Sequence, residues 1–126
     1  RRSSQTIPRH FIAQGDYSFE SGRAAMIELL SADNVPDGVF VANDLMAAGA
    51  LSAITDAGLT CPDDIKIVGF DDSVIAQTTR PALSTVRQDI VGLGMTAAGL
   101  MIDLLNGKMP KPVILPTELV IRASST

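Results

Sequence analysis

Short apolar runs alternate with helix-length segments along most of the chain. Residues 39–42 and 65–70 are rich in Val, Ile and Phe and are bounded by turn residues, which is typical of parallel strands buried on both faces. Residues 45–57 between them have the length of a crossover helix. The pattern therefore predicts an α/β fold in which a parallel sheet is flanked by helices.

The alternation extends to both sides of this unit. Residues 10–13 are expected to form a short strand, residues 73–81 a loop or short turn, and residues 84–87 a further extended segment, giving the order βαβαβ. Ser18 can cap a helix. The apolar face of that helix would consist of Phe19, Gly22, Met26, Leu29 and Leu30.

Spacing and stop signals define two more helices. In the segment 45–57 the apolar positions Leu45, Ala48, Leu51 and Ile54 precede Gly58, which suits a left-handed residue after a helix. The longest helix is expected over residues 89–105, with Asn106-Gly107 as its stop. Its inward positions would be Ile90, Leu93, Gly94, Ala97, Met101, Leu104 and Leu105. Pro110 and Pro112 then predict an extended exit, followed by strand-like runs at 113–115 and 119–121.

Polar residues follow directly after the predicted strands. Asn43-Asp44 ends one apolar run and Asp71-Asp72 ends the next. Ligands of open α/β sheets bind outside the carboxyl ends of the strands, so Asn43 and Asp71 are the better ligand candidates. Asp44 and Asp72 are equally well explained as helix caps. Tyr17 follows another strand-to-helix junction, where its ring can either stack on a sugar or heterocycle or cover the start of the helix.

Composition excludes several classes of protein. The chain has 126 residues, 46% of them apolar, and a net charge of −4 with no basic run beyond Arg1-Arg2, so this segment lacks the basic footprint of a nucleic-acid-binding surface. Cys61 is the single cysteine, which precludes an internal disulfide and fits a reducing, cytoplasmic compartment. No apolar stretch approaches the roughly 20 residues of a membrane span.

Three motifs that could indicate an enzyme or a cofactor have simpler explanations. Residues 92–97 match a G-x-G-x-x-A dinucleotide pattern, but no strand runs into the first glycine, so we expect small residues inside a helix and no cofactor. His10 has no Ser or Cys neighbour suggestive of a catalytic triad. Asp71 and Asp72 should point in opposite directions on an extended segment, so they are not expected to share a metal or substrate atom. We therefore expect no enzymatic activity.

In their order along the chain, six motifs resemble the LacI/GalR-type bacterial transcriptional repressors and, more loosely, the periplasmic sugar-binding proteins of transport systems. The motifs are Gly15-Asp16-Tyr17 with Glu20-Ser21-Gly22, Val41-Ala42-Asn43-Asp44-Leu45-Met46-Ala47, Pro62-Asp63-Asp64-Ile65, Val68-Gly69-Phe70-Asp71-Asp72, Leu83-Ser84-Thr85-Val86-Arg87-Gln88 and Leu115-Pro116-Thr117-Glu118-Leu119-Val120-Ile121-Arg122-Ala123-Ser124.

The resemblance implies roles for individual residues. In such proteins the aromatic residue after Gly-Asp packs against an effector, which would be the role of Tyr17. Asn43 and Asp71 would bond the effector, and Gln88 would lie near the hinge side of the cleft. The effector would be a sugar or related polar metabolite.

The resemblance also implies a periplasmic-binding-protein-like lobe of type I with an incomplete N-terminal lobe, so the chain is expected to be a fragment. Residues 1–88 and 113–126 would form mainly the C-terminal lobe, and residues 89–112 would pack in or cross to the N-terminal lobe. The helix-turn-helix head that reads operator DNA would precede Arg1.

The intact protein is expected to form a homodimer through the loop Ser73 to Pro81 and the neighbouring helix from Leu45 to Ile54. Apolar residues in the loop and alanines on the helix suit a contact between subunits, although they could instead pack inside their own lobe. The interface candidates are Ala47, Ala48, Leu51, Val74, Ile75 and Ala76. The function predicted by the resemblance is therefore effector sensing by a transcriptional regulator, and the alternative is a periplasmic sugar-binding protein.

Overall fold

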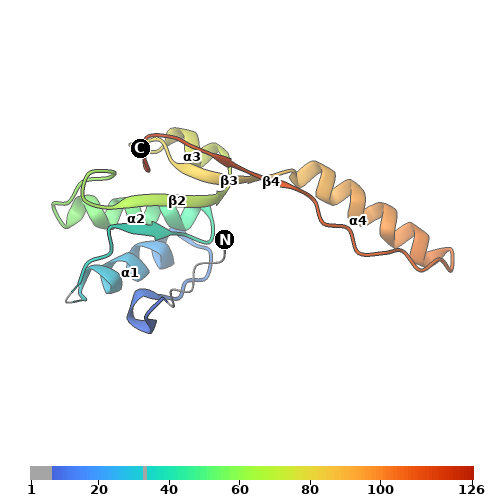
Figure 1. Ribbon diagram of the computed structural model, residues 1–126, viewed down its shortest axis with the longest axis horizontal. Coiled ribbons are helices and arrows are strands. Elements are labelled where there is room, and N and C mark those ends of the chain that lie inside the picture. The colour runs from blue at the N-terminus through green and yellow to red at the C-terminus, as the bar shows by residue number, and fades with distance from the viewer. Residues whose placement is uncertain (1–6, 33) are drawn as a thin grey trace.

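The structure is a computed structural model that describes residues 7–32 and 34–126, so Arg1-Arg2 lies outside the described part. A lobe of sheet and helices carries a long projecting helix (Figure 1). The strands are β1 (Gly38–Phe40), β2 (Lys66–Asp71), β3 (Ser84–Gln88) and β4 (Thr117–Val120). The helices are α1 (Phe19–Leu30), α2 (Asp44–Asp56), α3 (Val74–Thr78) and α4 (Ile90–Leu105), preceded by a 3₁₀ turn at Arg9–Phe11.

The strands form one mixed sheet in the order β1-β2-β3-β4. β1, β2 and β3 are parallel, with Phe40 opposite Val68 and Gly69 opposite Thr85. β4 is antiparallel to β3 and places Val120 opposite Thr85. The α/β fold with a sheet flanked by helices is confirmed, and the antiparallel strand arises because β4 returns from α4 along β3. The run predicted at 113–115 forms no strand.

The strand predicted at residues 10–13 is wrong. Hydrogen bonds from Phe11 N to Pro8 O and from Ile12 N to Arg9 O instead close a 3₁₀ turn. An extended segment becomes a strand only when a neighbouring strand pairs with it, and no described strand pairs with this segment. His10 is exposed there, with its ring centroid 4.4 Å from that of Phe11.

Caps predicted from the sequence define the helices. The Ser18 side chain accepts a hydrogen bond from Ser21 N at the start of α1. Gly58 follows α2 with φ of 75°. α1 and α2 touch backbone to backbone, because a Cβ at Gly22 would overlap Met46 and a Cβ at Gly49 would overlap Phe19. The loop predicted at 73–81 contains the short helix α3.

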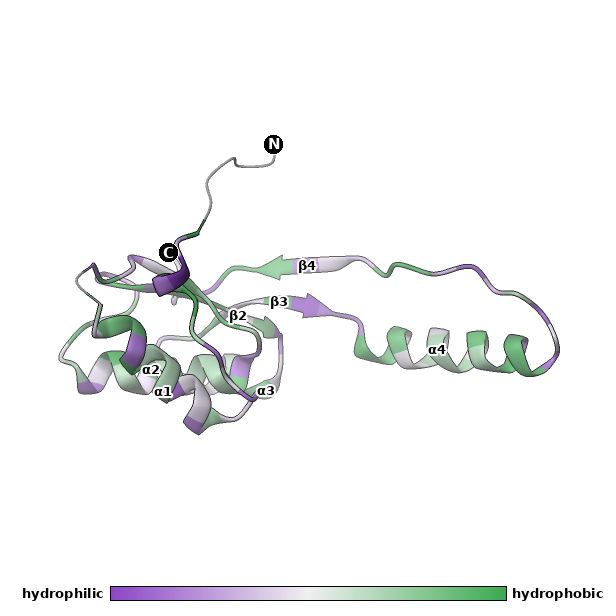
Figure 2. Cartoon of the chain, turned by 90° about the horizontal axis from the view of Figure 1, so that it is seen from below, coloured by the Kyte–Doolittle hydropathy of each residue, from purple (hydrophilic) through white to green (hydrophobic). Residues whose placement is uncertain are grey.

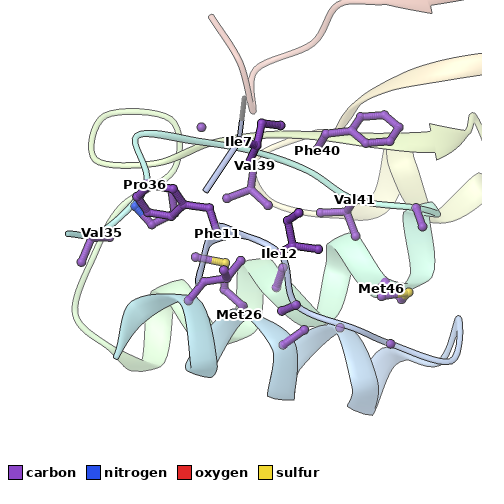
Figure 3. Close-up of a pocket in the computed structure, with 18 of the residues that line it drawn as sticks. Ile7, Phe11, Ile12, Met26, Val35, Pro36, Val39, Phe40, Val41 and Met46 are labelled. Carbon is purple, nitrogen blue, oxygen red and sulfur yellow. The ribbon is translucent and has the colours of Figure 1, made fainter. Parts of the chain in front are cut away.

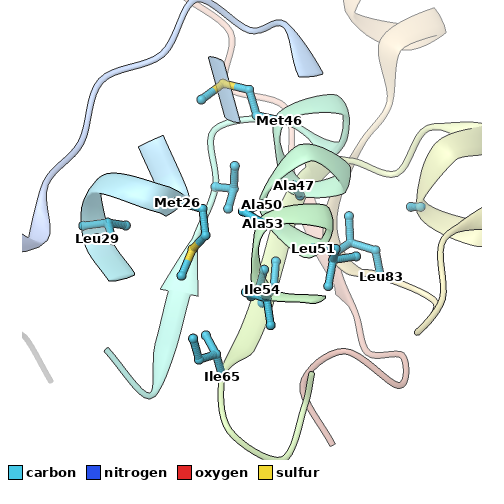
Figure 4. Packing of buried hydrophobic residues seen from close by; sticks show 13 residues of the cluster. Met26, Leu29, Met46, Ala47, Ala50, Leu51, Ala53, Ile54, Ile65 and Leu83 are labelled. Carbon is cyan, nitrogen blue, oxygen red and sulfur yellow. The ribbon is translucent and has the colours of Figure 1, made fainter. Parts of the chain in front are cut away.

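The apolar core lies between α1, α2 and the sheet (Figure 4). Its buried members are Met26, Leu29, Val41, Met46, Ala47, Ala50, Leu51, Ala53, Ile54, Ile65, Ile67, Ala76 and Leu83. Of the apolar positions noted in α2, Leu45 is exposed, because the helix turns Met46 and its small alanines towards the core. The other face of the sheet carries Phe40 and Phe70, whose rings meet edge to face at 6.4 Å.

α4 begins and ends as predicted. Asp89 caps its first turn by accepting a hydrogen bond from Gly92 N, and Gly107 follows it with φ of 77°. None of the residues of α4 is buried in the described chain, so the predicted inward face has no packing partner among the described residues. The helix lies beyond the end of β3, with apolar residues along its length (Figure 2), so it has no lobe surface to pack against. No helix of the described part is long and apolar enough to cross a membrane.

Candidate functional site

The four residues predicted to bind an effector form two hydrogen-bonded pairs at one edge of the sheet. Asn43 follows β1, Asp71 ends β2 and Gln88 ends β3, and these three strands run in the same direction. Asn43 Nδ2 donates to the backbone oxygen of Tyr17 at 3.1 Å. Gln88 Nε2 donates to Asp71 Oδ1 at 2.7 Å. The structure therefore brings the predicted residues to the carboxyl edge of β1, β2 and β3.

Asn43 also caps α2. Its Oδ1 accepts a hydrogen bond from Met46 N at 2.8 Å. The side-chain amide thus joins the start of α2 to the loop that carries Tyr17. The cap of this helix is Asn43, and the cap role considered for Asp44 is wrong.

Tyr17 presents its ring to solvent. It adopts φ of 70° and is 66% exposed. The preceding Asp16 accepts a hydrogen bond from Ser18 N, and its backbone N–H donates to Ser21 Oγ. Hydrogen bonds involving Ser18 and Ser21 lower the pKa of Asp16 to about 2, so the carboxylate stays ionised and keeps this loop closed.

Asp71 and Asp72 both adopt the left-handed backbone region, with φ of 109° and 54°. Non-glycine residues rarely adopt it, and such conformations persist only where surrounding contacts hold them. The extended segment predicted at these residues is therefore wrong, and the two side chains have different partners. Asp71 is half-buried and accepts from Gln88, which leaves Oδ2 without a hydrogen bond among the described residues.

Asp72 is an ion-pair centre and does not cap a helix. Its carboxylate accepts from Arg87 Nε at 2.6 Å and from Arg122 Nη2 at 2.7 Å, and its side chain is only 6% exposed. Burial alone would raise the pKa of this carboxyl, but the hydrogen bonds from Arg87 and Arg122 outweigh it and hold the pKa below its ordinary value. Arg122 also donates to Leu83 O, which ties the segment after β4 to the start of β3.

Asp44 is a buried bridge that sequence reasoning missed. It is 1% exposed. Its Oδ2 accepts from Ser73 N at 2.7 Å and from Ser73 Oγ at 3.0 Å, and its Oδ1 accepts from Thr85 Oγ1 at 2.6 Å. No motif in the sequence indicates that Ser73 and Thr85 bond Asp44. The bridge becomes visible only in the fold, which brings these two residues beside the start of α2.

A cavity of about 1050 Å³ lies beside this polar edge and is mainly apolar (Figure 3). It runs between residues 7–13, α1 and β1, and includes Phe11, Ile12 and Met26 in its lining. Of the four predicted ligand residues, only Tyr17 borders it. A hydroxyl-rich ligand needs hydrogen-bonding partners, so the polar edge fits such a ligand better than this cavity does.

The six predicted interface residues divide by burial. Ala47, Leu51 and Ala76 are buried in the lobe itself, and Ala48 and Ile75 are half-buried. Val74 is 78% exposed. A second hollow of about 350 Å³ adjoins this surface, and Ala48, Thr55 and Arg80 are among its lining residues.

Two other candidate sites have structural explanations. Gly92 and Gly94 lie inside α4, as predicted for small residues in a helix. Cys61 is half-buried, and its Sγ donates to Ser124 O at 3.4 Å. Burial raises the pKa of the Cys61 thiol, which keeps it protonated and unreactive. Within residues 7–32 and 34–126, no group of His, Cys, Asp and Glu side chains could hold a metal ion.

Comparison with known proteins identifies related chains. The profile of the periplasmic binding protein-like domain matches residues 2–125. The HTH-type transcriptional regulator CelR of Thermobifida fusca is 37% identical over 115 residues, which is 90% of this chain and 34% of that protein. The chain spans about a third of the length of the curated relatives it matches.

Solved structures of regulators share the fold. A complex of the transcriptional regulator CelR with cellobiose is 38% identical with a TM-score of 0.82, covering 88% of this chain and 35% of that one. The Lac repressor dimer bound to operator and an anti-inducer is also 38% identical with a TM-score of 0.82, covering 88% and 39%. These relatives are transcriptional regulators and not enzymes.

Proposed function

Because the chain belongs to the periplasmic binding protein-like domain family, we propose that it senses a small polar effector as part of a LacI/GalR-type transcriptional regulator. The observation that supports this most is the edge of the sheet at which Asn43 follows β1, Asp71 ends β2 and Gln88 ends β3. The regulator names of the relatives favour this function over that of a transport-associated sugar-binding protein.

The proposed effector is a sugar or related hydroxyl-rich metabolite. Asp71 offers carboxylate oxygens, Asn43 and Gln88 offer amides, and Tyr17 offers an exposed ring that can cover a sugar face. The relative solved with cellobiose supports this class of ligand. The four residues form one side of the proposed site, and a facing lobe would form the other.

The proposed regulation is a population shift in the intact, dimeric protein. An effector that binds one arrangement of the two lobes more tightly changes the balance between them, and only that difference in affinity does so. Operator DNA would be read by a separate head, because this chain carries a net charge of −4. A Lac repressor dimer on its operator is a related structure that supports this assembly.

The test is calorimetric titration of the intact regulator with cellobiose and a panel of mono- and disaccharides. Asp71→Ala should weaken the affinity for the bound sugar by roughly 10- to 150-fold, because it removes a charged hydrogen-bond acceptor. Asp64→Ala is the matched control, since Asp64 is an exposed carboxylate bonded to Thr60 on a distant loop. Equal affinity of the Asp71→Ala variant and the wild type, or no heat from any sugar, would contradict the proposal.

A further inference from the structure

A buried carboxylate with three hydrogen bonds connects the elements that carry the proposed ligand residues. Asp44 begins α2, directly after Asn43. Ser73 follows the turn that contains Asp71, and Thr85 lies on β3. The three hydrogen bonds of Asp44 therefore tie the start of α2 to the end of β2 and to β3.

The sequence leaves room for this carboxylate at one position of β2. A Cβ at Gly69 would lie 2.5 Å from Asp44 Oδ1 and 2.9 Å from a methyl group of Leu83. Glycine at this position thus lets the side chain of Asp44 lie against the strand and reach across to Thr85. A buried carboxylate is costly unless hydrogen bonds satisfy it, and here both of its oxygens accept at least one.

The turn held by Asp44 has an unfavourable backbone conformation. Asp71 and Asp72 are consecutive left-handed residues without the freedom of glycine. The turn is held by the arginines that pair with Asp72 and by a hydrogen bond from Asp72 N to Thr85 Oγ1 at 3.3 Å. It is also held by Asp44, which accepts from both the N–H and the hydroxyl of Ser73. If Asp44 could not accept these two hydrogen bonds, Ser73 would no longer connect the turn to α2.

We infer that Asp44 is a positioning residue, whose carboxylate holds Asp71 at a set place relative to Asn43 and Gln88. The inference rests on the proposed function for the meaning of this edge, but the placement itself is measurable without a ligand. The placement of Asp71 is measured through the hydrogen bond from Gln88 Nε2 to Asp71 Oδ1. Asp44 bonds neither of these two side chains, so an effect on this bond must be transmitted through the turn.

Two sets of variants in the ¹⁵N-labelled intact protein test the inference by NMR hydrogen exchange. Asp44→Asn removes the charge and replaces one of the two acceptor oxygens by a donor. Thr85→Val keeps the shape of the side chain but removes the hydroxyl that donates to Asp44 and also accepts from Asp72 N at 3.3 Å. Both should accelerate exchange of the Gln88 side-chain amide and of Ser73 N–H by about 10- to 150-fold. Thr85→Ser retains the hydroxyl and should restore wild-type exchange.

The control is Asp64→Asn, because Asp64 accepts from both the N–H and the hydroxyl of Thr60, as Asp44 does from Ser73, but on an exposed loop. It should leave the Gln88 amide unchanged. Folded Asp44→Asn or Thr85→Val protein with an unchanged Gln88 amide would overturn the inference, even if Ser73 exchanges faster. If Asp44→Asn fails to fold, Ser73→Ala decides, because it removes the hydroxyl that donates to Asp44 Oδ2 and leaves Thr85 in place, and it should accelerate exchange of the Gln88 amide. The proposed function is tested separately, by the sugar titration of the wild type and the Asp71→Ala variant.

Discussion

The side-chain amide of Gln88 donates a 2.7 Å hydrogen bond to Oδ1 of Asp71, so two residues proposed to bind one ligand are bonded to each other. The bond crosses from the end of β3 to the end of β2, next to the pairing of Asp71 with Arg87. A ligand hydroxyl that approaches Asp71 must therefore share Oδ1 with Gln88 or use Oδ2.

Gln88→Glu should make stability depend on pH. It places a second carboxylate beside Asp71, and two such groups cannot both ionise at this separation, so the pair has a pKa above the ordinary carboxyl value. A carboxyl group whose pKa is higher in the folded state than in the unfolded state stabilises the fold below about pH 4. This stabilisation is lost as the pH rises through the pKa of the folded state. We expect urea denaturation to show a loss of about 1–2 kcal/mol at pH 7 and little at pH 3.5.

The control for this variant is Gln77→Glu, which adds the same charge at an exposed position of α3. It should change stability little at either pH. An equal loss at both pH values in the Gln88→Glu variant would show that the new carboxylate does not meet Asp71.

Asp72→Asn should have the opposite pH dependence. The pKa of Asp72 is lower in the folded state, so its stabilisation is present above the unfolded value near 4 and is lost as the pH falls through the folded-state value. Because Arg87 is half exposed, we expect a loss of about 2 kcal/mol at pH 7, below the roughly 3–5 kcal/mol of fully buried pairs. Denaturation at pH 7 and pH 2 measures it, and a loss that persists undiminished at pH 2 would argue against the ion pairs as its source.

Ser124→Ala should destabilise the lobe although it changes one oxygen atom. The Ser124 hydroxyl is fully buried, donates to Ile67 O at 2.7 Å and accepts from Ser84 N at 2.8 Å. Its removal leaves a buried donor and a buried acceptor without a side-chain partner, at a cost of about 1–3 kcal/mol for an unsatisfied group. Thermal unfolding of the Ser124→Ala variant measures this loss, and Thr126→Ala is the control because the Thr126 hydroxyl is exposed. Equal melting temperatures of the two variants would contradict the prediction.

Tyr17 should act through its ring. Tyr17→Phe keeps the ring and should bind the sugar identified by titration nearly as well as wild type, whereas Tyr17→Ala should bind at least about tenfold less tightly. Neither replacement is glycine, so both face the same positive φ of 70° that Tyr17 adopts, and the comparison isolates the side chain. Equal losses of affinity in the two variants would assign the interaction to the hydroxyl.

Val74→Glu should weaken the proposed dimer. Val74 is the most exposed of the predicted interface residues, whereas a charge at Ala76 would be buried inside the lobe and would test folding instead. A twofold interface carries each substitution twice, so the new charges repel. Light scattering of the intact protein at micromolar concentration should show monomer for Val74→Glu and dimer for Ala24→Glu, which places the same charge on an exposed position of α1 outside the proposed interface. A dimer in both variants would place the interface elsewhere.

Helix ends could be predicted from the sequence because their chemistry is local. Ser18 and Asp89 cap helices by bonding a backbone N–H three residues ahead, and Gly58 supplies a left-handed residue where α2 ends. The position of Asn43 and Asp71 at the edge of the sheet could also be predicted from local sequence. A polar residue that follows a buried strand lies at that edge, and this does not depend on the rest of the fold.

Features that depend on distant partners could not be predicted. Residues 10–13 have strand-forming side chains, but a strand also requires a neighbour that the segment itself does not specify. The role of Asp44 depends on Ser73 and Thr85, which lie 29 and 41 residues away. The apolar pattern of α4 indicates that something covers the helix but not what.

The attachment of α4 limits how it can move. β3 leads into α4 and β4 returns from it, and the two strands are hydrogen-bonded with Gln88 opposite Thr117 and Thr85 opposite Val120. A body held by a single strand can swivel about every axis, but a two-stranded ribbon bends most readily out of its own plane. The ribbon therefore restricts α4 mainly to one motion, a bending of the β3–β4 pair out of its plane. The pairing that sets the direction of this bending ends at Gln88.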